Sequence, residues 1–296
     1  MRIVTHSGTF HADDVFAYSV LRDALDAFEF VRTRDMALID SADIVFDVGG
    51  IYDPIKGRYD HHMRDLPRRE DGTPYSSVGL IWRDYGRRAL ARLVPGMGED
   101  VLESVRQDID ATFILAIDQA DNGVATAGPS HLALLVEAFN PTWDSGQSYD
   151  DAFLEAADFA RGILVRACRQ AHAEAQALSL VMTAARRAQD ARVIVLDRKL
   201  PWEKAVFEGG LNDLLFVIYP NEDLTAWYCR TIPPEPNSFG QRLALPEAWR
   251  GLQETEFSEA AGIEDGVFCH PGGFICGARS QEPALRLAEK AIAIGP

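Results

Sequence analysis

Short apolar segments alternate with helical patterns along the first half of this chain, and this order restricts the possible folds more than any other feature. Strand-like segments occupy 2–8 and 42–50, and apolar residues recur at helical spacing over 13–25, 76–94 and 100–118. Strands that alternate with helices form parallel sheets, so the pattern predicts an α/β fold: a mainly parallel sheet flanked by helices. Ligands of such folds bind outside the carboxyl ends of the strands.

The second half begins with a long helical pattern and then returns to strands. Apolar residues keep helical spacing from Tyr149 to about Asp190. Strand-like segments and a closing helix follow at 191–197, 214–220, 226–232 and 283–293. The chain is therefore predicted to have three parts: a first domain at 1–150, a connecting helix at 151–190 and a smaller C-terminal α/β domain at 191–296.

The charge balance limits the expected partners. The chain carries 29 lysines and arginines against 45 aspartates and glutamates, which gives a formal net charge of −16. Binding to long nucleic acid depends on cationic residues that neutralise phosphates, so we expect no binding to long duplex DNA. A nucleic-acid substrate would have to be short and bound at a local site.

Other features favour a cytoplasmic protein without membrane contact. No apolar run approaches the roughly 20 residues that span a membrane, and the opening MRIVTH leaves no room for a signal peptide. The four scattered cysteines show neither zinc-type spacing nor a disulfide framework. The oligomeric state is not readable from the sequence, and a homo-oligomer remains open.

Residues that bind metals gather where these segments end. THSGTFHADD at 5–14 leads from a strand into a helix, FDVGG at 46–50 closes the second strand, and YDHH follows at 59–62. A fourth segment, AIDQADNG at 116–123, ends a predicted helix. Four of the seven histidines lie in these segments. The candidate ligands and their neighbours are His6, His11, Asp13, Asp14, Asp47, Asp60, His61, His62, Asp118 and Asp121.

This mixture of histidines and carboxylates suits divalent ions, and oxygen-rich sites favour manganese or magnesium. Two ions about 3.5–4 Å apart need a bridging carboxylate, and such a pair supports phosphoryl transfer. Each residue alone also has a structural interpretation. Asp47 suits a turn, Asp13 and Asp14 suit a helix N-terminus, and Asp118 and Asp121 suit a helix end. Their joint occurrence at four segment ends favours the metal site.

The same residues resemble a known group of enzymes. A histidine-rich first loop, a strand-end aspartate, Asp-His-His and a later aspartate are similar to the DHH phosphoesterase superfamily. More closely, THSGTFHADD, DVGGIYDP, RYDHH, AIDQADNG, FNPTW, DRKLPW and HPGGFICGARS resemble the MYG1 family over essentially the whole chain. The resemblance implies a DHH-phosphoesterase-like catalytic domain with two divalent ions, usually manganese, with magnesium or zinc as alternatives. It also implies 3′–5′ RNA exonuclease activity.

The resemblance implies roles for the first two segments. The superfamily motif is His-x3-Asp-x-Asp, whereas this chain has His6-x4-His11-x-Asp13, which is one residue longer. His6 and His11 would bind one ion and Asp13 the other, and Asp47 would bridge the two ions. The longer spacing leaves the role of Asp14 open, and we keep this residue as a catalytic candidate.

The later segments complete the implied site. His61 matches a metal ligand, His62 matches a position that faces the phosphate or supports the ligands, and Asp60 would orient the two histidines. The last ligand is either Asp118 or Asp121. We favour Asp121, because its DNG sequence is similar to the DTG of nanoRNases.

The second half resembles the substrate domain of these enzymes. Its glycine-rich HPGGFICG segment is expected to hold a phosphate on backbone N–H groups, and the DRKLPW loop offers further cationic contacts. Both segments also suit an ordinary turn and a solvated loop. The candidate substrate-binding residues are His270, Gly272, Gly273, Arg279, Arg198 and Lys199.

These observations predict a metal-dependent phosphodiesterase, a 3′–5′ exonuclease that cleaves RNA or short oligonucleotides with a hydroxide activated by two metals. One alternative is a hydrolase of another small phosphoester, such as a cyclic dinucleotide or a pyrophosphate-like compound. Another is a zinc-dependent N-deacetylase, which HADD suggests, but the chain has no His-x-x-His for the third ligand. The non-enzymatic alternative is a metal-stabilised binding protein.

Overall fold

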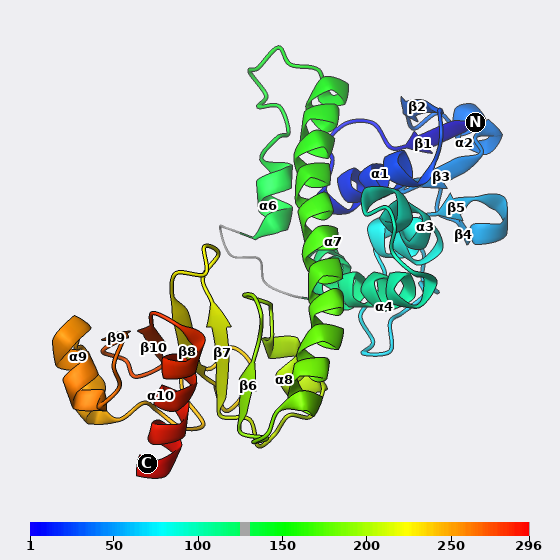
Figure 1. Cartoon of the computed structure of the whole chain (residues 1–296). Helices are drawn as coiled ribbons and strands as arrows, with labels where there is room; N and C mark the ends of the chain where they lie inside the picture. Colours follow the sequence, from blue (N-terminus) through cyan, green and yellow to red (C-terminus); the bar gives the residue numbers. More distant parts are fainter. Residues whose placement is uncertain (125–130, 296) are drawn as a thin grey trace. The chain divides into compact units, whose positions relative to one another are not determined.

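The first half of the chain folds around a sheet of short strands separated by helices. Figure 1 shows the computed structural model, which describes residues 1–124 and 131–295. The strands are β1 (Arg2–Thr5), β2 (Glu29–Arg32), β3 (Ile44–Phe46), β4 (Tyr52–Asp53) and β5 (Arg58–Tyr59). They lie in the order β2-β1-β3-β5-β4; β2, β1, β3 and β5 are parallel, and β4 is antiparallel to β5. The predicted α/β class with a mainly parallel sheet is confirmed.

Helices connect and flank these strands. They are α1 (Ala12–Ala24), α2 (Met36–Ser41), α3 (Ser77–Leu93), α4 (Glu99–Ile109), α5 (Leu115–Asp121), α6 (Leu132–Glu137) and the start of α7 (Tyr149–Arg187), with a short 3₁₀ helix at Pro54–Lys56. Helices α1 and α3 pack along each other beside the sheet (Figure 1). Ile39 of α2 packs with Val4 and Val45 of the sheet. A π-helical turn at Asp110–Ile114 joins α4 to α5, so the helix predicted over 100–118 has an irregular middle.

Two features of this region differ from the pattern expected from the sequence. The strand predicted at 42–50 is only three residues long, because Asp47 leaves the extended conformation with a φ of 55°. Strand β2 and helix α2 were not predicted. Both are short, and segments of four to six residues carry too few apolar positions to show a clear period.

The chain divides into two compact units, Met1–His172 and Ala173–Pro296, with the division inside α7. The second unit contains β6 (Val193–Val195), α8 (Glu203–Glu208), β7 (Phe216–Pro220), β8 (Trp227–Thr231), α9 (Glu254–Ala261), β9 (Gly266–Cys269), β10 (Ile275–Ala278) and α10 (Gln281–Ile294), and a 3₁₀ turn at Glu247–Trp249. Its sheet has the order β6-β7-β8-β10-β9, in which β6 and β7 are parallel and the other neighbours antiparallel.

Both faces of the second sheet are buried. Along β7, Phe216 and Ile218 belong to the apolar cluster that contains α9 and α10 residues. Val217 and Tyr219, which alternate with them, belong to the cluster that contains the end of α7 and α8. Side chains of a strand point alternately to its two faces, so a nearly continuous apolar strand such as FVIYP is typical of this position. The β9–β10 hairpin was not predicted.

Helix α7 is 39 residues long and begins where the long helical pattern was expected. Ala156, Ala160 and Leu164 are fully buried, as their three- and four-residue spacing requires for one face of a helix. Within the described residues, neither α7 nor any other helix has the combination of length and apolar character needed to cross a membrane.

Candidate metal centre

The carboxyl ends of three neighbouring strands bring the predicted polar residues together. His6 directly follows β1, Asp47 directly follows β3, and residues 60–62 directly follow β5. These strands are parallel neighbours, so their carboxyl ends lie at the same edge of the sheet. The first turn of α1 adds Asp13 and Asp14 at this edge, and both side chains are buried.

Asp47 lies at the centre of this group. Its Oδ2 atom is 3.0 Å from Nε2 of His6, and its Oδ1 atom is 3.1 Å from Nε2 of His61. The residue has a φ of 55°, a left-handed conformation that is strained for a residue with a side chain and is common at functional sites. The turn that shortens β3 thus places one carboxylate between two histidines.

On one side of Asp47, Asp14 completes the His6 cluster, which consists of His6, Asp14 and Asp47. Asp14 Oδ2 lies 3.2 Å from Nε2 of His6. Its other oxygen, Oδ1, accepts a hydrogen bond from the backbone N–H of His11 at 3.0 Å. Asp14 therefore has both functions considered from the sequence, because it caps helix α1 and also faces the site.

On the other side, Asp13, Asp47 and Asp121 surround Nε2 of His61, and we call these four residues the His61 cluster. The Oδ2 atoms of Asp13 and Asp121 lie 3.6 Å and 3.4 Å from that nitrogen. His11 is more exposed, and one of its ring nitrogens lies within 4.8 Å of carboxylate oxygens of Asp13 and Asp121. Asp47 is common to the two clusters.

This grouping differs from the one that the family resemblance implies. His6 and His11 were expected on one ion and Asp13 on the other, whereas the structure places His11 beside Asp13 and Asp121. The physical reason is the loop at 6–11. His6 ends a strand in the sheet, while His11 precedes α1 and lies on the side of the site that the end of α5 reaches.

The buried carboxylates strongly perturb one another. Burial, followed by repulsion from Asp47 and other carboxylates, raises the pKa of Asp13 well above its ordinary value. Burial would also raise the pKa of Asp47, but hydrogen bonds from His6 and His61 hold that pKa below its ordinary value. Burial would lower the pKa of His6, but hydrogen bonds to Asp14 and Asp47 raise it to about 10. The site concentrates negative charge that one or more cations would offset.

A buried carboxylate oxygen without a partner indicates that the site suits metal ions. Oδ1 of Asp13 is among the six buried side-chain N and O atoms of the described residues that have no hydrogen-bond partner. A buried polar atom without a partner costs about 1–3 kcal/mol, and more for a charged group, so such atoms are rare without a functional reason. Carboxylate oxygens and imidazole nitrogens together suit divalent ions such as manganese. The residues present therefore fit the two-ion site expected from the sequence.

Asp60 is placed to orient the two histidines that follow it. Its Oδ1 atom accepts hydrogen bonds from the backbone N–H groups of His61 and His62, at 2.7 Å and 3.1 Å, and lies 2.7 Å from Nδ1 of His62. Its Oδ2 atom accepts the N–H of Gly50. The side chain of Asp60 is thus used within the loop and is not part of either cluster, while His62 is 62% exposed beside the clusters.

Asp118, the other candidate for the last ligand, lies outside both clusters. The guanidinium of Arg69 donates to its Oδ2 atom at 2.7 Å, and the hydroxyl and N–H of Ser76 donate to Oδ1 at 2.7 Å and 3.0 Å. Arg69 also pairs with Asp110 at 2.8 Å. Asp118 thus anchors the segment that follows Asp-His-His, and the structure places Asp121 rather than Asp118 in the His61 cluster.

Two supporting residues were not identified from the sequence. The hydroxyl of Ser77 donates to Oδ1 of Asp47 at 3.0 Å, and its N–H donates to Oδ2 of Asp13 at 3.1 Å. The amide of Asn140 binds both the N–H and the C=O of Phe10, at 3.0 Å and 2.8 Å, and so fixes the loop before His11. Ser77 could have been identified from the sequence, because two consecutive serines precede a helical pattern there. Asn140 could not, because its contact with Phe10 joins residues that are 130 positions apart.

A pocket of about 430 Å³ opens over the His6 side of the centre. Residues that line it include His6, His11, Arg34, Asp47, Asp60 and His62. Predicted ligands, the exposed His62 and a cationic side chain thus border the same space. This is the part of the first unit where a substrate would meet bound ions.

Comparisons with known proteins identify the family of this chain. Residues 2–292 match the family MYG1_exonuc, described as Uncharacterised protein family (UPF0160). The chain belongs to the MYG1 family. It is 36% identical over 318 residues to a MYG1 protein of Schizosaccharomyces pombe, covering 99% of this chain and 97% of that protein. It is also 36% identical over 324 residues to the human MYG1 exonuclease, covering 99% of this chain and 86% of that protein.

Among solved structures, this MYG1-family chain is similar to the pGpG-specific phosphodiesterase PggH from Vibrio. The two share 13% identity with a TM-score of 0.29, and the match covers 99% of this chain and 98% of PggH. A TM-score this low denotes only a loose likeness between the two folds.

In the second unit, the glycine N–H groups of the HPGGFICG turn are not free to bind a phosphate. The N–H groups of Gly272 and Gly273 donate to Nδ1 and to the C=O of His270, at 3.0 Å and 2.9 Å. Arg279 pairs with Glu254 at the surface. The two amides expected to hold phosphate are therefore already bonded inside the β9–β10 turn. In the other predicted loop, Arg198 pairs with Asp197 and Lys199 is exposed.

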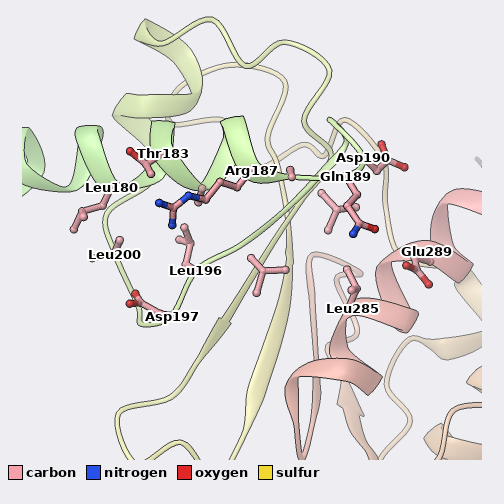
Figure 2. A pocket seen from close by; sticks show the side chains of 14 residues that line it. Leu180, Thr183, Arg187, Gln189, Asp190, Leu196, Asp197, Leu200, Leu285 and Glu289 are labelled. Atoms are coloured by element: carbon pink, nitrogen blue, oxygen red, sulfur yellow. The ribbon is translucent and has the colours of Figure 1, made fainter.

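A second pocket, of about 490 Å³, lies within the second unit (Figure 2). Its apolar lining includes Leu180, Leu196 and Leu285, and Arg187 and Glu289 also border it. All six residues predicted to bind substrate lie in the described part of the chain, and none of them lines this pocket. This pocket therefore lends no support to their predicted role.

Proposed function

We propose that this protein is a metal-dependent phosphodiesterase that shortens RNA or other short oligonucleotides from the 3′ end. The observation that carries the proposal is Asp47, whose two oxygens face His6 and His61 in two adjoining clusters. A carboxylate shared between neighbouring ion sites suits two-metal phosphoryl transfer. The name of the human relative, MYG1 exonuclease, supports a nuclease. The RNA substrate and the direction follow from the family resemblance of the sequence motifs.

The residues divide naturally between two ions. His6 and Asp14 would hold one, His61, Asp13 and Asp121 would hold the other, and Asp47 would contact both. When bound, such ions lower the pKa of a water molecule and offset the charge of the phosphate. Buried hydrogen bonds from Ser77 keep the carboxylates of Asp47 and Asp13 oriented before anything binds.

His62 is suited to donate a proton to the leaving oxygen. The hydrogen bond between its Nδ1 atom and Asp60 raises the pKa of His62 above its ordinary value. It also fixes the ring orientation, so that Nε2 is the nitrogen available for proton transfer. The side chain lines the pocket and is 62% exposed, which leaves it accessible to a substrate. In 3′–5′ cleavage the proton would pass from Nε2 to the departing 3′-oxygen, and a nucleoside 5′-monophosphate would be released.

The proposal is tested with purified protein, manganese and short RNA labelled at either end. We expect 5′-labelled RNA to shorten stepwise, and 3′-labelled RNA to release labelled mononucleotide in the first cycle. Asp47→Asn should abolish this activity with the fold retained. Asp40→Asn, at an exposed carboxylate of α2, is the matched control and should leave it unchanged.

Three outcomes discriminate between the functions. The proposal would be overturned if RNA oligonucleotides, DNA oligonucleotides and dinucleotides all stay uncleaved in the presence of manganese, magnesium and zinc. Cleavage of dinucleotides alone would restrict the substrate to small phosphoesters. Equal activity of Asp47→Asn and wild type would show that the centre described here is not the catalytic one.

A further inference from the structure

Arg34 borders the pocket over the metal centre, although no sequence motif pointed to it. It is exposed and lines the same space as His6, His11 and Asp47. The other ionisable side chains in the described lining are carboxylates and histidines, which are occupied by the metal site and its support. Arginine keeps its positive charge at every physiological pH. In the described lining of this pocket, Arg34 is therefore the one side chain with a permanent positive charge.

The topology explains why Arg34 reaches this place. Strand β2 is parallel to β1, with Arg32 paired to Thr5 at the carboxyl end of both strands. The N–H of Thr33 then donates to the C=O of Thr5 at 2.8 Å, which keeps the two chains side by side beyond the strands. Arg34 comes next, at the strand exit adjacent to that of His6. Arg34 thus lies just beyond the carboxyl end of a parallel strand, where ligands of such sheets bind and where His6 and Asp47 also lie.

Among the described residues, Arg34 has no partner that would account for its position. In residues 1–124 and 131–295, no carboxylate lies within ion-pair distance of Arg34, and no hydrogen bond from its side chain is formed. Two other exposed arginines of the first unit have such partners, since Arg22 pairs with Asp158 and Arg92 pairs with Asp26 at 2.7 Å, whereas Arg64 has none among the described residues. What distinguishes Arg34 from Arg64 is its place in the lining of the pocket over the metal centre. An anionic ligand would supply the missing partner.

We propose that Arg34 binds a non-bridging oxygen of the substrate phosphate, or of the adjacent phosphate, in this pocket. The identity of the ligand as a phosphodiester rests on the proposed function. A guanidinium donates two parallel hydrogen bonds to a phosphate, which fixes the orientation of the group as well as attracting it. This contact places a phosphate-binding residue on the first unit, at the metal centre. The cationic phosphate contacts predicted from the sequence, Arg198, Lys199 and Arg279, were all in the second half.

Three variants test the contact. Arg34→Ala removes the guanidinium, and Arg34→Lys keeps the charge but not the paired donors. The matched control is Arg64→Ala, because Arg64 is also exposed and follows Asp-His-His, but it is not part of the pocket lining. Calorimetry with manganese alone checks the metal centre. Calorimetry with adenosine 5′-monophosphate, in the presence of manganese, measures phosphate binding independently of turnover.

We expect Arg34→Ala to weaken binding of adenosine 5′-monophosphate by about 10- to 100-fold, the usual effect of losing a hydrogen bond to a charged group. Arg34→Lys should give an intermediate affinity, and Arg64→Ala the wild-type affinity. Manganese affinity should be the same in all four proteins. Added guanidinium ion should restore part of the oligonucleotide turnover of Arg34→Ala, an effect that a purely structural role would not produce.

The outcomes separate this inference from the proposed function. If Arg34→Ala binds the nucleotide as tightly as wild type, or if wild type does not bind it, the inference is overturned. If wild type binds the nucleotide and cleaves no oligonucleotide, the proposed function fails. A loss of nucleotide affinity in Arg34→Ala would then still support the phosphate contact.

Discussion

The hydroxyl of Ser77 donates a hydrogen bond to Oδ1 of Asp47 at 3.0 Å. Ser77 opens helix α3, and its own N–H donates to Asp13. The start of α3 therefore holds two of the carboxylates in the His61 cluster, although it supplies no ligand itself. Residues that orient metal ligands in this way affect metal affinity almost as strongly as the ligands.

Replacing Ser77 should weaken the metal centre without unfolding the protein. Ser77→Ala removes the donor to Asp47 but keeps the backbone N–H that binds Asp13. We expect manganese affinity, measured by calorimetry, to fall by about 10-fold or more. The control is Ser41→Ala, at an exposed serine of α2 whose hydroxyl binds only the carbonyl of Leu38 among described residues. Equal manganese affinity in Ser77→Ala and wild type would contradict the orienting role.

Neutralising Asp13 should separate metal binding from stability. Burial and repulsion from the neighbouring carboxylates raise the pKa of Asp13, so its charge is unfavourable in the folded metal-free protein. Asp13→Asn should therefore raise the melting temperature in EDTA. It should also lower phosphodiesterase activity by more than about 100-fold and remove the stabilisation by manganese. A variant that manganese still stabilises as strongly as wild type would show that Asp13 is not a ligand.

Asp118 should make stability depend on pH in a defined direction. Burial raises the pKa of its carboxyl from 3.8 to about 6. The folded protein then holds this proton more tightly than the unfolded chain. The contribution of Asp118 to the unfolding free energy therefore decreases as the pH rises from about 4 to about 6, and is constant above that range.

Urea unfolding in EDTA at a series of pH values measures this effect. Asp118→Asn cannot titrate, so the unfolding free energy of wild type minus that of the variant should fall across this range. A shift of about two pKa units corresponds to a change on the order of 3 kcal/mol. Parallel curves for the two proteins would show that Asp118 has the same pKa in the folded and unfolded states.

The four cysteines should be unreactive in the native protein. Cys168, Cys229, Cys269 and Cys276 are all buried and unpaired. Burial raises the pKa of Cys168 and of Cys269 to about 12, so their thiolates are scarce at pH 8. We expect no reaction with Ellman's reagent until urea unfolds the chain, and then four thiols per chain. Rapid labelling of the folded protein would show that helix α7 or one of the strands β8, β9 and β10, which carry these cysteines, opens readily.

Local patterns were sufficient to predict the α/β class, the longest helices and about half of the strands in the described residues. The apolar run before Asp47 and the helical spacing in α7 depend on side chains a few residues apart, so they are visible in the sequence. The same holds for the prediction that His6, Asp47 and the segment at 60–62 would meet. Each directly follows a strand, and strand ends of a parallel sheet share one edge.

The grouping of these residues was decided by the tertiary structure, because it depends on strand order and on contacts between distant segments. Parallel pairing of β2 with β1 brings Arg34 to the pocket, and nothing near Arg34 in the sequence reveals that pairing. Arg69, 49 residues away, binds Asp118, and Asp121 is the aspartate of this segment that faces His61. The sequence by itself determined which chemical groups stand at the strand ends. Only the packing of the strands and helices decided which of them share an ion, a hydrogen bond or a pocket.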